Sequence, residues 1–228
     1  MILFTRLRCG FESRLNNKKN DMIDNINIIK PLLNFEEKGD FYMLYVFKRK
    51  KDQPEGEKDN HQSVRTIKTY CIESIDHLER RYDEVNQLCE MFKARAYIHV
   101  QKQNHRDVSL DMLASLAERI KNGVQNQKGL FDSVVGQIKT QEKRWIIDID
   151  NVSMDGFNHD PYQVSLREYI NELQKEVGKD QGMTFIKTRS GFHIITQPFN
   201  VMKFKERYPE VDIQKKNPTL LYYPNSLD

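Results

Sequence analysis

The stretch RWIIDID, residues 144–150, is a short apolar segment that carries two aspartates into what its composition predicts to be a core β-strand. Side chains alternate across a strand, so Asp148 and Asp150 share one face. The opposite face is apolar and consists of Trp145, Ile147 and Ile149. Two neighbouring carboxylates raise each other's pKa and are costly to bury unless a cation or hydrogen-bond donors compensate them. The segment therefore predicts a partner for the two aspartates.

The composition limits the class of protein. The chain has 228 residues, 38% of them hydrophobic and 30% charged, which suits one α+β domain with a polar surface. No window approaches the roughly 20 apolar residues of a membrane span, and the N-terminus lacks the features of a secretory signal. We therefore expect a cytoplasmic protein without a membrane partner. Cys9, Cys71 and Cys89 show no metal-ligand spacing, so any metal would need oxygen ligands.

Residues 1–21 differ from the rest of the chain. The formal net charge of +3 arises within them, because they hold five basic and two acidic residues. Global charge therefore does not indicate nucleic-acid binding. The string RCGFESR, residues 8–14, is what one reading frame gives for the T-arm of a tRNA gene. We expect a disordered leader here, either read-through from a tRNA gene with Met22 as the natural start, which would favour a phage or mobile-element origin, or an ordinary basic tail.

The remaining residues, 22–228, are expected to form a single α+β domain with a mixed central sheet and flanking helices. Alternation and β-branched content predict strands at 41–49, 64–72, 94–100, 144–150, 183–188, 192–196, 211–213 and 219–223. The first two of these strands would form a hairpin with a long charged loop.

Helices are predicted from their caps and from their apolar spacing. The expected helices run from Ser74 to about Lys93, from Ser109 onward, around 130–138, from Asp160 to near Gly178, and within 199–208. The helix from Ser109 would carry an apolar stripe of Leu110, Leu113, Leu116, Ala117 and Ile120.

The segment KTRSGFHIIT, residues 187–196, places a tight turn between two predicted strands. Such a turn offers several hydrogen-bond donors suited to a phosphate chain. The groups that could face a phosphate belong to Lys187, Arg189, Ser190, Gly191 (its backbone N–H) and His193. Taken alone, a single histidine in a hairpin is more often a core residue with satisfied ring nitrogens.

The strand at 94–100 alternates strictly and places Arg95, Tyr97 and His99 on one face. Arginine pairs with phosphate and tyrosine stacks on bases, so this face is a candidate nucleotide or template surface. The alternative is an amphipathic strand that packs under a helix.

The order of these motifs resembles the archaeo-eukaryotic primase superfamily, the primase-polymerases. An Asp-x-Asp strand is followed by a helix, by a strand pair with Ser-Gly-x-His, and by the hydrophobic-Asp-hydrophobic triplet at 211–213; the resemblance covers roughly residues 94–223. It implies a primase-polymerase-like catalytic core in which Asp148, Asp150 and Asp212 are catalytic metal ligands. It also implies that Ser190 and His193 contact the nucleotide phosphates. Asp155, Asp160 and Glu210 are alternatives to Asp212 as the third carboxylate.

The function that this resemblance implies is metal-dependent nucleotidyl transfer. Carboxylates on a rigid strand are the hard oxygen ligands that Mg²⁺ and Mn²⁺ prefer. The expected partners are nucleoside triphosphates, a single-stranded DNA template, and a helicase or another replication subunit. Two alternatives stay open, namely a metal-dependent nuclease and a non-catalytic, replication-accessory domain that binds nucleic acid.

Overall fold

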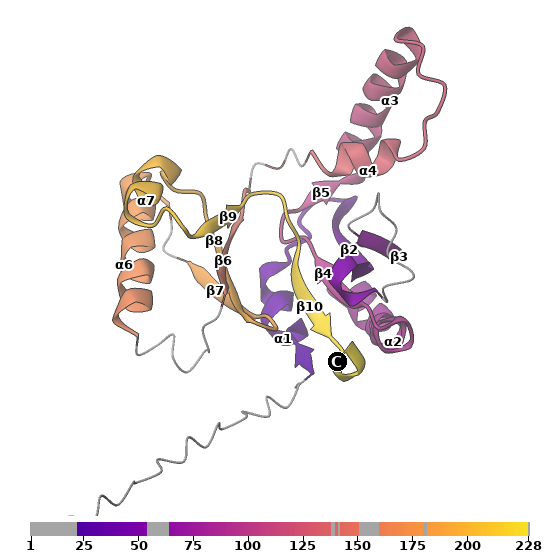
Figure 1. Ribbon diagram of the computed structural model, residues 1–228. Helices are drawn as coiled ribbons and strands as arrows, with labels where there is room; N and C mark the ends of the chain where they lie inside the picture. The colour runs from indigo at the N-terminus through magenta and orange to yellow at the C-terminus, as the bar shows by residue number, and fades with distance from the viewer. Residues whose placement is uncertain are drawn as a thin grey trace, which may run out of the picture.

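The computed structural model describes residues 22–53, 64–137, 140, 142–150, 160–179 and 182–227 (Figure 1). Within these ranges the protein combines two antiparallel β-sheets with six α-helices, so the expected α+β class is confirmed. The predicted leader lies outside the described residues, as do residues 151–159 with the alternative carboxylate Asp155.

The first sheet has the strand order β1-β10-β4-β2-β3, with β5 paired to the start of β2. Its strands are β1 (Ile23–Asp24), β2 (Asp40–Arg49), β3 (Val64–Ile72), β4 (Arg95–Ile98), β5 (Gln103–Asn104) and β10 (Thr219–Tyr223). The expected hairpin is confirmed as β2 and β3, which pair from Tyr42 opposite Ile72 to Arg49 opposite Val64.

The second sheet has the strand order β7-β8-β6-β9. Its strands are β6 (Trp145–Asp150), β7 (Met183–Lys187), β8 (Gly191–Thr196) and β9 (Asp212–Gln214). Every strand pair in both sheets is antiparallel, so the prediction of one mixed central sheet is wrong. Alternation in a sequence predicts that a strand exists, whereas its partner is chosen by contacts between distant segments.

The helices are α1 (Ile26–Ile29), α2 (Ile75–Phe92), α3 (His105–Lys121), α4 (Leu130–Val135), α6 (Pro161–Glu176) and α7 (Val201–Arg207). Short 3-10 turns occupy Lys30–Leu32, Lys50–Asp52 and Asn225–Leu227. The Ser74 hydroxyl caps α2 by accepting from the His77 N–H, and the Asp160 carboxylate caps α6, both as predicted. In the part of the chain that is described, no helix has the length and apolar character needed to cross a membrane.

Helix α3 begins four residues earlier than predicted. Its cap is Asn104, whose side-chain oxygen accepts from the Arg106 N–H at 3.0 Å. The Ser109 hydroxyl lies inside the helix and donates to the His105 carbonyl at 2.7 Å. Asparagine caps helices at least as well as serine, so the sequence offers both Asn104 and Ser109 as caps. Local preference alone does not choose between them.

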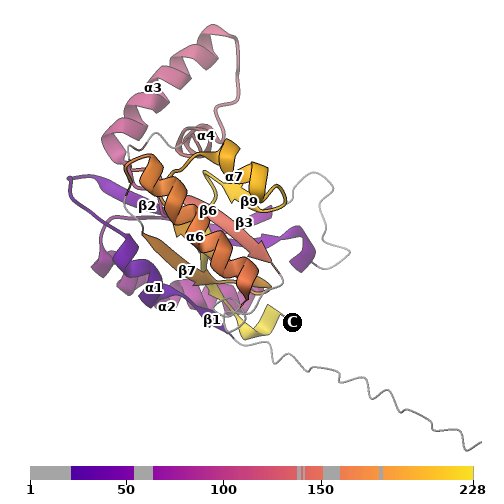
Figure 2. The ribbon, with the colours of Figure 1, turned by 90° about the vertical axis from the view of Figure 1, so that its left-hand side faces the viewer.

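The two faces of the second sheet have different neighbours. Ile147 and Ile149 on β6 pack in an apolar cluster with residues of α6 and α7, and α6 lies across this sheet in Figure 2. On the opposite face, Ile146 and Ile195 join the main core of the first sheet. The aspartates of β6 alternate with the α6-facing residues. They therefore point toward the first sheet.

The Ser-Gly-x-His segment needs its glycine because β8 approaches β6 closely there. Gly191 lies opposite Asp150, and a Cβ atom at Gly191 would stand 1.9 Å from the backbone oxygen of Ile149. No side chain fits at that separation without moving one of the strands.

We expect Gly191→Ala to lower the free energy of unfolding by about 2 kcal/mol or more, because overpacking against backbone forces the strands apart. Gly182→Ala is the matched control, since a Cβ atom there meets nothing within 4 Å. Urea denaturation measures both. Equal stability of Gly191→Ala and the unmodified protein would contradict the close approach of β8 to β6.

Candidate functional site

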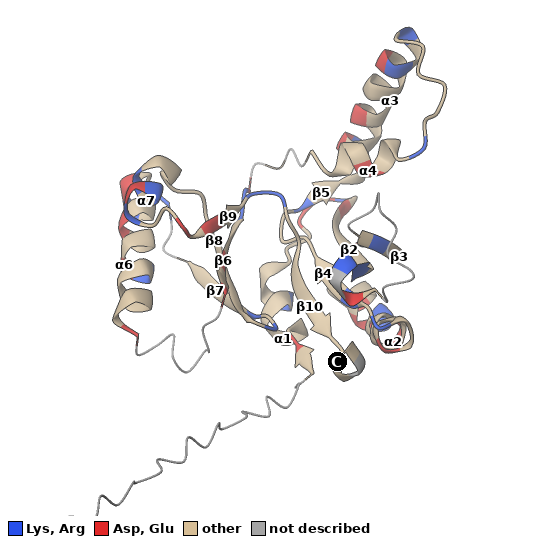
Figure 3. Cartoon of the chain, viewed as in Figure 1, with Lys and Arg blue, Asp and Glu red and all other residues tan. Residues whose placement is uncertain are grey.

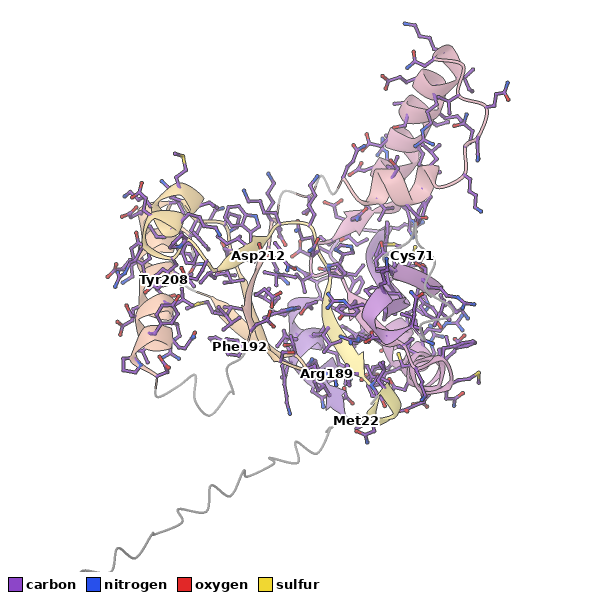
Figure 4. The ribbon with its side chains drawn as sticks, viewed as in Figure 1. Met22, Cys71, Arg189, Phe192, Tyr208 and Asp212 are labelled. Atoms are coloured by element: carbon purple, nitrogen blue, oxygen red, sulfur yellow. The ribbon has the colours of Figure 1, made fainter. Side chains whose placement is uncertain are left out.

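Three motif residues lie side by side on the second sheet. Strand β6 is flanked by β8 and β9, and Asp148 is directly opposite both His193 on β8 and Asp212 on β9. Directly opposed residues project to the same face of a sheet. Figure 4 labels Asp212 on β9 and Arg189 at the end of the β7–β8 hairpin. The sheet thus brings together segments that are far apart in the sequence.

A single side-chain amide bridges two of the carboxylates. Gln214 Nε2 donates to Asp148 Oδ2 at 3.2 Å and to Asp212 Oδ2 at 3.0 Å. Gln214 was not identified from the sequence, although it follows Asp212 by two residues and therefore shares its face. Neutral donors partly offset the repulsion between the two carboxylates.

The pKa of Asp148 is raised above its ordinary value. Burial is the main cause, and the charges of Asp150 and Asp212 add to it. The Arg49 guanidinium and the Gln214 hydrogen bond act in the opposite direction but do not cancel the effect. Burial and the two neighbouring carboxylates therefore favour the protonated form of Asp148.

His193 is buried between Asp148 and the first sheet. Its Nδ1 atom lies 2.9 Å from the Thr219 hydroxyl, and its Nε2 atom lies 3.5 Å from Asp148 Oδ1. Burial and then the nearby Arg49 charge lower the pKa of His193 to about 4. The ring is therefore neutral near pH 7, and a hydroxyl that donates to Nδ1 leaves the Nε2 proton facing Asp148.

The turn between β7 and β8 is closed by its own hydrogen bonds. The Gly191 N–H donates to the Thr188 hydroxyl at 3.1 Å, and the Thr188 N–H donates to the Gly191 carbonyl at 2.9 Å. The Gly191 N–H, expected to face a phosphate, donates within the turn instead. Arg189 and Ser190 are exposed at the tip of the turn.

A pocket of about 410 Å³ lies between the two sheets beside these residues. The second sheet and its turn contribute Asp148, Asp150, Thr188, Arg189, Ser190, His193 and Gln214. The first sheet contributes Phe47, Arg49, Val64, Arg95, Tyr97 and Leu220. Asp212 is exposed and is not part of the lining, but it is hydrogen-bonded to Gln214, which is. Lys187 is also exposed and does not line the pocket. Figure 3 shows an acidic residue on β9 and basic residues on parts of β2 and β3 in the other sheet.

The first sheet supplies aromatic and basic groups to the pocket. The Tyr97 and Phe47 rings are stacked with centroids 4.6 Å apart, and the Arg49 guanidinium lies 5.7 Å from the Tyr97 centroid. Arg95 is buried, and its guanidinium pairs with Asp52 at 2.6 Å. Phe47 and Arg49 were missed because they end a strand next to a long charged loop, where no local pattern marks them.

His99 is not part of this pocket lining. It follows β4, is buried, and packs edge-on against Tyr45 with centroids 5.6 Å apart. Burial lowers the pKa of His99 to about 4. The structure therefore places Arg95 and Tyr97 at the pocket and separates His99 from them.

Two alternative third carboxylates have other contacts. The Asp160 side chain accepts from the first backbone N–H groups of α6, and the Glu210 carboxylate accepts from the Tyr162 hydroxyl. Neither lines the pocket between the sheets. Of Asp160, Glu210 and Asp212, the one that adjoins Asp148 is Asp212.

The donor set at Asp148 has the chemistry of a Mg²⁺ or Mn²⁺ site, because it consists of carboxylate oxygens on neighbouring rigid strands. Within the described ranges, no group of three or more His, Cys, Asp or Glu side chains is arranged closely enough to hold a metal ion. The Gln214 amide stands between Asp148 and Asp212.

The chain matches no known family model, no curated protein and no solved structure.

We expect Asp150→Asn to lower the pKa of Asp148 toward its ordinary value, because the Asp150 charge is one of the causes that raise it. The folded protein binds more protons than the unfolded chain between the unfolded pKa, about 3.9, and the raised folded pKa. Stability therefore falls as pH rises through that window. Relieving the repulsion should leave the metal-free variant at pH 7 as stable as the unmodified protein or slightly more stable.

Carbon-detected NMR titration of the Asp148 carboxyl group and urea denaturation at pH 7 measure these two effects. Asp83→Asn, an exposed change on α2, is the control. An unchanged pKa of Asp148 in Asp150→Asn would show that the two carboxylates do not interact. A loss of stability of about 1–3 kcal/mol would mean that Asp150 is held by structural donors.

Proposed function

We propose that this protein is a metal-dependent nucleotidyltransferase of the primase-polymerase type, which acts on nucleoside triphosphates with a nucleic-acid template. The observation that carries the proposal is the alignment of Asp148, His193 and Asp212 on three neighbouring strands. These residues come from the three motifs of the resemblance, and they meet on the sheet face that lines a pocket. Unrelated local motifs would have no reason to converge in this way.

In this proposal, Asp148, Asp150 and Asp212 hold Mg²⁺ or Mn²⁺. Bound divalent ions would stabilise negative charge on the attacking hydroxyl and on the leaving pyrophosphate. Burial and the charges of Asp150 and Asp212 raise the pKa of Asp148, and a perturbed pKa beside a pocket supports a functional role. Without a cation, Gln214 holds the Asp148 and Asp212 side chains in place, because its amide donates a hydrogen bond to each of them.

The opposite wall of the pocket suits the remainder of a nucleotide. Arg49 and Arg189 line the pocket and can pair with phosphate oxygens, to which the Ser190 hydroxyl can also donate. The stacked rings of Phe47 and Tyr97 offer an aromatic surface for a base of the nucleotide or of a single-stranded DNA template. Neutral His193 lies beside Asp148, with its Nε2 atom 3.5 Å from Asp148 Oδ1.

One observation favours a second candidate function, a non-catalytic, replication-accessory domain that binds nucleic acid. The Gln214 amide already bridges Asp148 and Asp212, and both ring nitrogens of His193 face partners. A site whose polar groups are mutually satisfied has less need of metal. The two functions predict different responses to manganese.

We expect Mn²⁺ to raise the Tm of the protein, because binding to the folded state alone is stabilising. Asp148→Asn should abolish this shift and lower nucleotidyl transfer by about a hundredfold or more, since the charge that holds the metal is removed. Asp83→Asn on α2 is the matched control and should leave both properties unchanged. Thermal melts measure the first effect, and labelled nucleotides with a single-stranded template, resolved by product length on a gel, measure the second.

The other outcomes of this experiment separate the functions. A protein that gains no stability from Mn²⁺ and forms no product, yet binds single-stranded DNA, would be the accessory domain. Shortening of the template in place of extended products would identify a nuclease. Full activity of Asp148→Asn would contradict the assignment of the metal site.

We expect Ser190→Ala to weaken nucleoside triphosphate binding by several-fold more than single-stranded DNA binding, because Ser190 is an exposed donor on the turn beside the pocket. Its stability should be unchanged. His193→Ala should instead cost about 1–3 kcal/mol of stability, since the buried Thr219 hydroxyl loses its partner. Calorimetric titration and urea denaturation separate the effects. An unchanged nucleotide Kd in Ser190→Ala would remove this turn from the phosphate site.

A further inference from the structure

Helix α3 has two apolar faces, and only one of them is packed. Val108, Met112 and Leu116 lie at intervals of four residues and pack with α4. A second set of apolar residues lies on an adjoining side of the helix, about a third of a turn away, at intervals of three and four. We call this set the apolar seam, and it consists of Leu110, Leu113, Ala117, Ile120 and, just past the helix, Val124.

The seam is exposed along its length. The exposed fractions are 55% for Leu110, 64% for Leu113 and 63% for Ile120. Figures 1 and 2 both show α3 standing out from the body of the protein. Alternating intervals of three and four are the spacing by which one helix packs along another. Scattered exposed apolar residues are common, whereas a continuous stripe marks an interaction surface.

An acidic pocket adjoins one end of the seam. It has a volume of about 540 Å³, and Leu110 belongs both to the seam and to the pocket lining. Its acidic lining residues are Glu36, Glu37, Asp40, Asp107, Asp111 and Glu142. Lys102 is the one basic residue of this lining, and its Nζ atom already lies 3.2 Å from Asp40 and 3.6 Å from Glu36. The pocket therefore carries excess negative charge.

This charge determines which partner fits the seam. Nucleic acid and anionic lipid would be disfavoured at the acidic pocket, whose lining holds six carboxylates and one lysine. A protein helix with apolar residues at the same spacing and with Lys or Arg near one end would bury the seam and place its cations at the acidic pocket. The acidic pocket shares no lining residue with the pocket between the sheets, so such a partner leaves the proposed active site open.

We propose that the apolar seam of α3 and the adjoining acidic pocket form a docking surface for a basic amphipathic helix of a partner protein. This surface is independent of the nucleotidyltransferase proposal, because it uses none of the residues assigned to that site.

The test uses the full chain and a labelled, three-heptad synthetic peptide with Leu along one face and Lys elsewhere. Its controls are a peptide with Glu in place of Lys and a scrambled Leu/Lys peptide of the same composition. The seam variant is Leu113→Gln with Ile120→Gln, which retains good helix formers at exposed positions. The matched variant is Met91→Gln with Met202→Gln, since Met91 and Met202 are 73% and 80% exposed on other helices.

Fluorescence anisotropy should detect binding of the Leu/Lys peptide to the unmodified protein. In the seam variant the Kd of this peptide should rise about tenfold or more. Asp107→Lys should weaken binding as well, because it reverses a charge of the acidic pocket. The matched methionine variant should bind normally. Equal binding of the Glu or scrambled peptide, no binding at all, or an equal loss in the methionine variant would overturn the proposal. Sedimentation of the unmodified protein as a dimer that the seam variant dissociates would assign the surface to a second copy of the chain instead.

Discussion

The contact between Asp148, Gln214 and Asp212 is the constraint on which the second sheet depends. Two carboxylates on facing strands share one amide, and His193 stands on the other side of Asp148. Desolvated like charges destabilise a sheet unless donors or cations lie close to them. The strand order β8-β6-β9 places Gln214 of β9, which donates to Asp148, on one side of the central aspartate and His193 of β8 on the other.

The division into two sheets turns this arrangement into a pocket. One face of the second sheet is closed by α6 and α7 over an apolar cluster, so its polar face is left for the first sheet. The first sheet lines the pocket with arginine and aromatic side chains of β2 and β4. Gly191 allows β8 to run close enough to β6 for the opposed residues to meet. The pocket therefore has carboxylates on the wall formed by the second sheet, and aromatic and arginine side chains on the wall formed by the first sheet.

Local features of the fold could be predicted from the sequence, and non-local ones could not. The Ser74 and Asp160 caps and the alternation in β6 depend on neighbouring residues, so helices α2 and α6 and the direction of Asp148 were predictable. Strand pairing depends on distant contacts, which is why two antiparallel sheets replaced the expected mixed one. The roles of Thr219 and Arg49 could not be predicted for the same reason, because these residues lie near His193 only when the two sheets meet.

Strand β10 links the order of synthesis to the completion of the pocket. It lies between β1 and β4 in the first sheet, although about two hundred residues separate it from β1 in the chain. A nascent chain on the ribosome therefore holds β1 and β4 as unpaired edges until residues 219–223 emerge. Unpaired strand edges are sites where other chains can pair, and β10 covers such an edge of β4. Thr219 and Leu220 belong to that strand, so the pocket between the sheets is complete only once β10 has paired with β1 and β4.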